Sequence, residues 1–237
     1  MTYIILVAGK GTNLQPLTLK QPKSLYKLDG ETTVLQRLVR KIRKFDDDAE
    51  IVVVVGFMYR HVQKEMLSEN VKFVHNPFYD VTSSIASLWF AREYLQRENI
   101  IIINGDVVFE DKVFKDIICK HTDIPYVLVD STLANNGKYN VQIDANKICV
   151  MSKQLTSYSA SYANVVKLDA VTSRFMLEEM ENMVNEGMYI LFCEDVLVQM
   201  IFSNNFELFY YDIKDYSWTE VDNVDDLIKA KEIQANN

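Results

Sequence analysis

Short apolar runs alternate with longer stretches of helical periodicity through the first half of the chain, and this alternation narrows the possible folds most. The clearest run is residues 51–55, where one isoleucine is followed by four valines. Consecutive β-branched residues predict a strand that is buried on both faces, as in the parallel sheets of α/β proteins. The four isoleucines of residues 100–103 predict a second such strand.

The order of the predicted elements in this half is strand, loop, helix, strand, helix, strand, helix, strand. The predicted strands are residues 3–8, 51–55, 71–74 and 100–103, and the predicted helices are residues 33–45, 59–67 and 83–97. Helical crossovers join parallel strands, so this order predicts an α/β fold with a Rossmann-like, mixed and mostly parallel sheet flanked by helices. In such sheets, ligands bind beyond the carboxyl ends of the strands.

The second half has a different character, with shorter strands separated by turn residues. Its predicted strands are residues 126–130, 139–144, 147–153 and 206–211, and its predicted helices are residues 173–185, 194–202 and 224–234. The chain has only seven glycines and four prolines and no segment rich in either, so a flexible linker is not expected. We therefore expect a single domain over residues 1–237, made of two halves, 1–125 and 126–237.

Charge and cysteine content limit the classes of partner. The net charge of −8 argues against a nucleic-acid-binding protein, which usually needs a basic face. The three cysteines, Cys119, Cys149 and Cys193, are widely spaced, as is typical of a reducing compartment. Residues 1–8 are apolar but lack a basic segment, which favours a buried strand over a signal peptide. No apolar run approaches the length of a membrane span. A cytoplasmic protein without a nucleic-acid or membrane partner is expected.

Two glycines, Gly9 and Gly11, follow the first predicted strand. Glycines let backbone amides approach an anion closely. The loop lacks the ending of a Walker loop, and Leu14 stands where the dinucleotide fingerprint requires a third glycine. From the residues alone, phosphate binding and an ordinary tight turn both remain open.

Charged side chains near the predicted loops are suited to phosphate and metal chemistry. Lys23 follows a proline and could meet a phosphate as a point charge. Asp106 follows a glycine at the end of a predicted buried strand, a good position for holding a hard cation. Alternation places Glu220 and Asp222 on the same face of a short extended segment. Each residue also has a purely structural interpretation, as a solvated lysine, a turn aspartate or a helix cap.

Together, the order and spacing of these motifs resemble the sugar-phosphate-type nucleotidyltransferase family, whose fold is of the nucleotide-diphospho-sugar transferase type. The pattern is L-x-A-G-x-G-T, P-L-T, P-K-S-L, N-G-D and E-V-D-N-x-x-D-L, and it extends from Tyr3 to Leu227. Asn76-Pro77, followed by T-S-S-I-A-S-L-W at residues 82–89, resembles the branch that uses CTP and small non-sugar acceptors. Phosphocholine and 2-aminoethylphosphonate cytidylyltransferases belong to that branch.

The resemblance implies roles for residues of the nucleotide-binding half, 1–125. The implied nucleotide-binding residues are Leu6, Ala8, Gly9, Lys10, Gly11, Thr12, Asn13, Lys23 and Gly105. Lys23, Asp106 and Asp222 would be catalytic: Lys23 would neutralise charge on the α-phosphate, and the two aspartates would hold Mg²⁺, the expected cofactor. The family usually has arginine at the position of Asn13, so an uncharged residue replaces a side chain that normally grips the triphosphate.

The acceptor-binding half, 126–237, is expected to close the pocket against the start of the helix predicted near residue 83. Free backbone amides at a helix N-terminus favour an anion. The candidate acceptor-binding residues are Thr82, Ser83, Ser84, Ser87, Lys138, Lys153, Glu194 and Asp195. An acidic pair facing the pocket, Glu194 and Asp195, would suit an amine-bearing acceptor.

The resemblance therefore implies an enzyme that joins CTP to a small phosphorylated or phosphonylated acceptor and releases pyrophosphate. Such a product would be a precursor of a cell-surface polysaccharide or a lipid headgroup, and the enzyme could be a homodimer. Two alternatives stay open. One is a hexose-1-phosphate nucleotidyltransferase that uses UTP or dTTP. The other is an inactive nucleotide-binding sensor, for which the replacement at Asn13 is the main argument.

Overall fold

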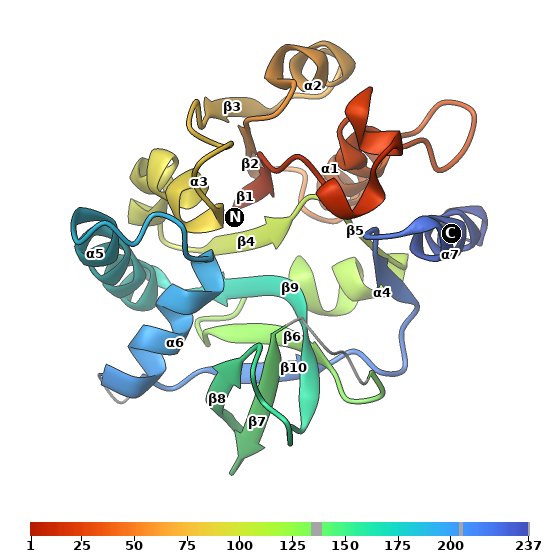
Figure 1. The fold of residues 1–237 in the computed structure, drawn as a ribbon. Helices are drawn as coiled ribbons and strands as arrows, with labels where there is room; N and C mark the ends of the chain where they lie inside the picture. The colour runs from red at the N-terminus through yellow and green to blue at the C-terminus, as the bar shows by residue number, and fades with distance from the viewer. Residues whose placement is uncertain (134–138, 204–205, 237) are drawn as a thin grey trace.

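A nine-stranded sheet forms the centre of the molecule in the computed structural model, which describes residues 1–133, 139–203 and 206–236 (Figure 1). Its main path runs in the order β10-β6-β9-β4-β1-β2-β3; off this path, β7 pairs with β9, and β8 pairs with β7. The strands are β1 (Thr2–Val7), β2 (Glu50–Val55), β3 (Lys72–His75), β4 (Ile100–Asn104), β6 (Tyr126–Asp130), β7 (Asn140–Asp144), β8 (Lys147–Ser152), β9 (Ala160–Leu168) and β10 (Phe209–Asp212).

The pairing of these strands confirms the predicted mixed, mostly parallel sheet. Strand β1 pairs in parallel with β2 and β4, β2 with β3, and β10 with β6. Strand β9 is antiparallel to β4, β6 and β7. The carboxyl ends of β1 and β4 therefore meet at the same edge of the sheet.

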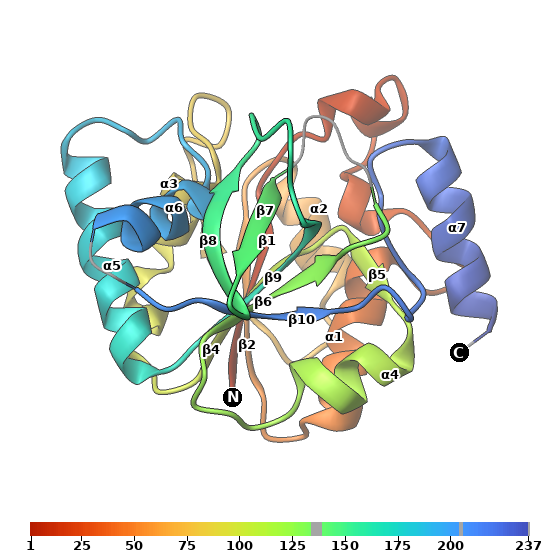
Figure 2. The same cartoon turned by 90° about the horizontal axis from the view of Figure 1, so that it is seen from below.

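Helices cover both faces of the sheet, as expected (Figures 1 and 2). They are α1 (Val34–Phe45), α2 (Tyr59–Glu65), α3 (Ser84–Phe90), α4 (Asp111–Val113), α5 (Ala170–Asn185), α6 (Cys193–Ser203) and α7 (Val224–Ala235). Helices α3, α5 and α6 bury one apolar core, and α1, α2 and α4 bury another on the opposite face. Helix α7 packs beyond α1 over a smaller apolar cluster.

Among the differences from the sequence prediction, one concerns the helix that begins near residue 83 and one concerns strand β9. The helix predicted over residues 83–97 is wrong as a single helix, because α3 ends at Phe90 and a separate 3-10 helix (Arg92–Gln96) follows. Strand β9 is not predicted by the sequence patterns, although all nine of its residues are buried. One of them is Lys167, whose ammonium donates to Asn99 Oδ1 at 2.9 Å and to the Thr122 carbonyl. Because β9 contains buried polar residues, its apolar periodicity is too weak to predict a strand.

A small second sheet brings the C-terminal segment to the end of β4. Strand β11 (Trp218–Glu220) runs antiparallel to β5 (Val107–Phe109), with Glu220 opposite Val107. The Val221 amide then donates to the Asp106 carbonyl at 2.9 Å. This pairing, which links positions more than 100 residues apart, carries the acidic C-terminal motif to Asp106.

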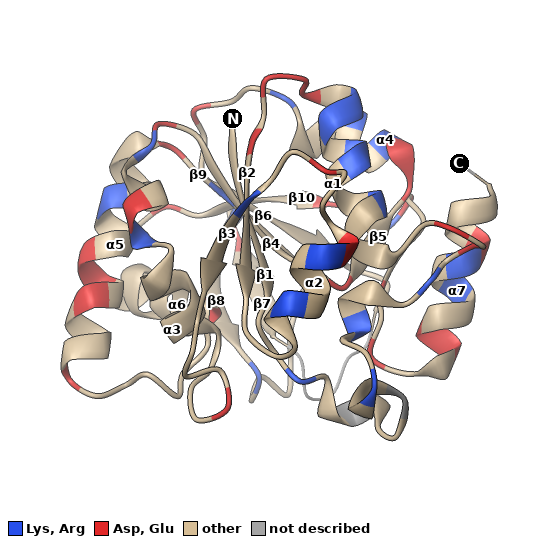
Figure 3. Cartoon of the chain, turned by 90° about the horizontal axis from the view of Figure 1, so that it is seen from above, with Lys and Arg blue, Asp and Glu red and all other residues tan. Residues whose placement is uncertain are grey.

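Figure 3 shows acidic and basic residues interspersed over the outer helices, with basic residues on α1 and α2 and acidic residues prominent on α5. Among the described residues, no helix combines the length and the apolar character that a membrane crossing requires.

Candidate active site

A cavity of about 810 Å³ opens at the carboxyl ends of β1 and β4. Gly105 makes the close approach of these two strands possible. A Cβ at this position would lie 2.1 Å from Val7 Cγ1 and 3.0 Å from Ile5 Cγ2 on β1. Only glycine fits here without displacing β1. The close packing of Gly105 against β1 therefore determines where the next residue, Asp106, lies on the cavity wall.

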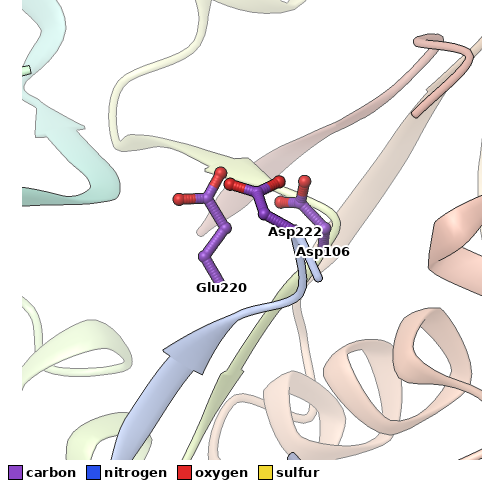
Figure 4. Close-up of side chains that lie close together, drawn as sticks. All are labelled: Asp106, Glu220 and Asp222. Carbon is purple, nitrogen blue, oxygen red and sulfur yellow. The ribbon is translucent and has the colours of Figure 1, made fainter. Parts of the chain in front are cut away.

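Three carboxylates meet on the wall of this cavity and project to the same side (Figure 4). Asp106, Glu220 and Asp222 each contribute an oxygen, and these oxygens lie within 4.8 Å of one another. Asp106 follows β4, whereas Glu220 ends β11 and Asp222 lies just beyond it. The structure thus brings together the two predicted metal ligands and adds Glu220, which the alternation of side chains already placed on the same face as Asp222.

Lys23 lies between two of these carboxylates. Its ammonium nitrogen is 2.9 Å from Asp222 Oδ1 and also contacts Asp106 Oδ2. Burial would lower the pKa of the Lys23 ammonium, but the charges of Asp106 and Asp222 outweigh burial and raise that pKa above its ordinary value. Lys23 is therefore a fixed positive charge on the cavity wall.

The donor set fits a hard divalent cation. One carboxylate oxygen, Asp106 Oδ1, is buried and has no hydrogen-bond partner among the described residues. Three carboxylates against a single ammonium leave an excess of negative charge, and carboxylate oxygens are the ligands that Mg²⁺ prefers. A buried oxygen without a partner is costly unless a ligand satisfies it.

The glycine-containing loop forms the adjoining wall. Of the predicted nucleotide-binding residues, those that line the cavity are Leu6, Ala8, Gly9, Lys10, Thr12, Lys23 and Gly105. Gly11 is not a lining residue; it has a φ of 61°, and a Cβ there would lie 3.3 Å from the Lys23 side chain. Gly11 therefore leaves room for Lys23 beneath the loop. Asn13 lies in the 3-10 helix Thr12–Leu14, and its side chain is outside the described part of the structure.

Only some of the predicted acceptor-binding residues lie together on the wall of the cavity. Those that line the cavity are Thr82, Ser83, Ser84, Ser87, Lys153 and Glu194. Lys138 lies outside the described residues. The prediction that Asp195 faces the cavity is wrong: its carboxylate accepts hydrogen bonds from Tyr139 Oη and the Phe192 amide, both at 2.8 Å. Successive helical residues point about 100° apart, so only Glu194 of the acidic pair reaches the cavity.

Loop carbonyls occupy two backbone amides of the expected anion site at the start of α3. The Ser83 amide donates to the Tyr189 carbonyl at 3.1 Å, and the Ile85 amide donates to the Leu191 carbonyl at 3.3 Å. These amides are therefore not available to a phosphate. The hydroxyls are held instead by buried Asn76, whose Nδ2 donates to Thr82 Oγ1 and Ser87 Oγ at 3.2 and 3.0 Å.

Aromatic side chains on the acceptor side were not predicted. The ammonium of Lys153 lies 3.4 Å from the ring centre of Phe192 and 4.9 Å from that of Tyr139. Glu194 is buried nearby, and burial raises the pKa of its carboxyl above the ordinary value. The chain has 13 tyrosines and 12 phenylalanines, so nothing in the sequence singles out these two rings.

Comparison with known proteins identifies relatives over part or all of the chain. Residues 3–135, more than half of the chain, match the MobA-like NTP transferase domain. The bifunctional protein GlmU of Methanococcus maripaludis is 33% identical over 118 residues, which are 48% of this chain and 26% of that protein. The choline-phosphate cytidylyltransferase of Streptococcus pneumoniae is 24% identical over 241 residues, covering 100% of this chain and 99% of that protein. The chain thus aligns with about a quarter of the length of the GlmU relative.

Solved structures share the fold at low sequence identity. The CTP:phosphocholine cytidylyltransferase LicC from Streptococcus pneumoniae has a TM-score of 0.81 at 19% identity and covers 98% of both chains. The inositol-1-phosphate CTP transferase from T. maritima has a TM-score of 0.79 at 20% identity, over 98% of this chain and 96% of that one. A UDP-glucose pyrophosphorylase has a TM-score of 0.74 at 12% identity, and the match covers 99% of this chain and 98% of that one. With its sheet, its glycine-containing loop and the matched residues 3–135, the chain belongs to the MobA-like NTP transferase domain family.

Proposed function

We propose that this protein is a Mg²⁺-dependent cytidylyltransferase that joins CTP to a small phosphorylated or phosphonylated acceptor with a cationic group. The observation that carries the proposal is the meeting of Lys23 with three carboxylates beside the glycine-containing loop of one cavity. Residues 1–125 would supply most of the nucleotide side and residues 126–237 most of the acceptor side. The near full-length similarity to a choline-phosphate cytidylyltransferase supports CTP as the nucleotide.

In the proposed reaction, a phosphate or phosphonate oxygen of the acceptor attacks the α-phosphorus of CTP. The bond between the α-phosphorus and the oxygen bridging to the β-phosphorus breaks, and that oxygen leaves with the electron pair as part of pyrophosphate. A phosphorylated acceptor gives a CDP-linked product, and a phosphonate gives a CMP-linked product. No group of the protein forms a covalent intermediate, so the protein acts by positioning and charge stabilisation.

The residues of the cavity have separate tasks in this reaction. Backbone amides of the loop around Gly9 would hold the phosphates. The ammonium of Lys23 would stabilise negative charge that grows on the α-phosphate and the departing pyrophosphate. Asp106, Asp222 and Glu220 would hold Mg²⁺. Bound there, Mg²⁺ would neutralise charge on the α-phosphate and orient it.

The acceptor side already stabilises a cation. The rings of Phe192 and Tyr139 hold the ammonium of Lys153, and the buried carboxyl of Glu194 lines the same cavity. An aromatic ring face attracts a cation through its quadrupole. A cationic group of the acceptor would therefore find a suitable environment beside Lys153 or in its place. The fold alone does not select the acceptor, since an inositol-1-phosphate CTP transferase shares it.

A matrix of nucleotides and acceptors tests this proposal. Each of CTP, UTP, dTTP, ATP and GTP is combined with phosphocholine, aminoethylphosphonate, phosphorylated amino acids, polyol phosphates and sugar phosphates, and pyrophosphate release is measured. We expect the fastest release with CTP and a cationic acceptor, and none from the Asp106→Asn control. Fastest release with UTP or dTTP and a hexose phosphate would favour the sugar nucleotidyltransferase. CTP binding without pyrophosphate release from any pair would favour a sensor.

A further inference from the structure

Asn164 has an unusual backbone conformation in the middle of the central strand β9. Its φ of 60° lies in the left-handed region, although it is not a glycine. The strand pairing shows a bulge here: Val127 and Val129 of β6 are two residues apart, but their partners Val166 and Tyr162 are four apart. A non-glycine residue in this region stores strain, and such residues concentrate at functional sites.

The side chain of Asn164 links the ends of two other strands. Its Nδ2 donates to Glu220 Oε2 at 2.8 Å, and its Oδ1 accepts from Asn104 Nδ2 at 2.9 Å. All three side chains line the cavity, and Asn164 is 8% exposed. Because a carboxylate only accepts hydrogen bonds, the amide group of Asn164 must face Glu220, and the donor from Asn104 fixes this orientation.

The backbone by itself does not require asparagine at this position. Glycine adopts a φ of 60° without a steric penalty, so asparagine adds only its side chain and the hydrogen bonds that it makes. One of those bonds ends on Glu220, whose carboxylate lies within 4.8 Å of the carboxylates of Asp106 and Asp222. Glutamate has one more rotatable bond than aspartate, so Glu220 gains most from such an anchor.

We propose that Asn164 is a positioning residue that fixes the Glu220 carboxylate in the cluster with Asp106 and Asp222 and so strengthens divalent-cation binding. The inference rests on the proposed function for the identity of the nucleotide, but the cation affinity is measurable without turnover. Groups that orient the ligands of a metal typically contribute about 10–100-fold to its affinity. The bulge in β9 is then the feature that turns Asn164 toward Glu220.

Two substitutions separate the side chain from the backbone. Asn164→Gly keeps the left-handed conformation and removes both hydrogen bonds. Asn164→Asp keeps the shape and replaces the donor with a carboxylate that repels Glu220. The matched control is Asn146→Gly, because Asn146 also has a left-handed φ, 66°, but lies exposed in the turn between β7 and β8.

The test is calorimetric titration of Mn²⁺ into each protein in the presence of CTP and without acceptor, followed by the Mg²⁺ dependence of pyrophosphate release. We expect both Asn164 variants to bind Mn²⁺ about 10–100-fold more weakly than the wild type, and Asn146→Gly to bind it unchanged. The Mg²⁺ concentration that gives half-maximal pyrophosphate release should rise in both Asn164 variants, while the KM for the acceptor stays the same. In the double variant Asn164→Gly/Glu220→Gln, the two losses should not add, because both changes remove the same contact.

Wild-type Mn²⁺ affinity in a folded Asn164→Gly protein would overturn the inference and leave Asn164 as a structural link between strands. If Asn164→Gly does not fold, the Mn²⁺ titration of Asn164→Asp is the test, and wild-type affinity in that variant would likewise overturn the inference. The proposed function fails differently: the wild type would bind Mn²⁺ and CTP and yet release no pyrophosphate with any acceptor. The two failures are therefore distinguishable.

Discussion

The ammonium nitrogen of Lys23 lies 2.9 Å from Oδ1 of Asp222, a residue 199 positions further along the chain. The same ammonium contacts Asp106, so a single lysine connects the 3-10 helix Lys23–Leu25, the end of β4 and the segment before α7. This contact balances part of the negative charge of the carboxylate cluster. The charge balance at Lys23 has consequences for both stability and turnover.

Lys23→Met should leave the carboxylate cluster without its positive partner. We expect the free energy of unfolding to fall by roughly 1–3 kcal/mol without divalent cations, because a buried charge loses its partner. Added Mg²⁺ should stabilise this variant more than it stabilises the wild type, because the cation replaces the missing charge. Turnover should fall more than the KM for CTP rises, as expected for charge that grows in the transition state. Thermal denaturation with and without Mg²⁺ and steady-state kinetics check both parts. Unchanged kinetics would leave Lys23 with a structural role.

Asp106→Asn and Asp222→Asn should each lower turnover by orders of magnitude while the fold survives. Each substitution removes a charge that would hold Mg²⁺ and keeps the size of the side chain. Pyrophosphate release measures activity, and circular dichroism monitors the fold. Asp144→Asn, at an exposed position on β7, is the control and should have wild-type activity. Near-normal turnover in either test variant would remove that residue from the metal site.

Asn13→Arg should tighten CTP binding if this loop can place an arginine against the triphosphate. A charge-assisted hydrogen bond to phosphate typically contributes roughly 1.5–3 kcal/mol, or about 10–100-fold in affinity. Calorimetric titration with CTP gives the dissociation constant directly. An unchanged or weaker affinity would mean that the triphosphate is held in another way in this protein.

Glu194→Gln should stabilise the protein at neutral pH. Burial raises the pKa of the Glu194 carboxyl above its ordinary value of 4.5, so the folded state binds more protons than the unfolded state between those two pKa values. Stability is therefore lost as the pH rises through this window and stays reduced above it. The variant should have the higher Tm at pH 7, and its advantage should shrink below about pH 4.5. Calorimetric scans between about pH 4 and pH 8 check this, with exposed Glu186→Gln as the control. A lower Tm than the wild type at pH 7 would show that ionised Glu194 is stabilising.

The sequence predicted the fold where local patterns carry the information. The apolar runs of β2 and β4 are buried on both faces, so their composition reveals them directly. Strand β9 is missed because buried Lys167 and the left-handed Asn164 interrupt its apolar character, and its pairing with β4, β6 and β7 is tertiary information. The break after α3 likewise has no signal in the helical periodicity of residues 83–97.

The residues of the candidate site that belong to a recognisable sequence motif could be predicted. Asp106 follows a buried strand, and Asp222 lies beside Glu220 in an alternating segment, so both could be singled out as ligands. The orientation of the Asp195 side chain could not be predicted from the sequence, because it depends on contacts with Tyr139 and Phe192. The loop carbonyls that accept from the Ser83 and Ile85 amides are also positioned by tertiary structure.

The most direct test of the account is ³¹P NMR of the protein with CTP, Mg²⁺ and phosphocholine or aminoethylphosphonate. Attack at the α-phosphorus predicts that CTP resonances disappear while pyrophosphate and a new CDP-linked or CMP-linked product appear in equal amounts. Chelation of Mg²⁺ should stop both changes. CTP that stays intact with every acceptor, or that is converted to CDP and free phosphate, would contradict the proposed nucleotidyl transfer.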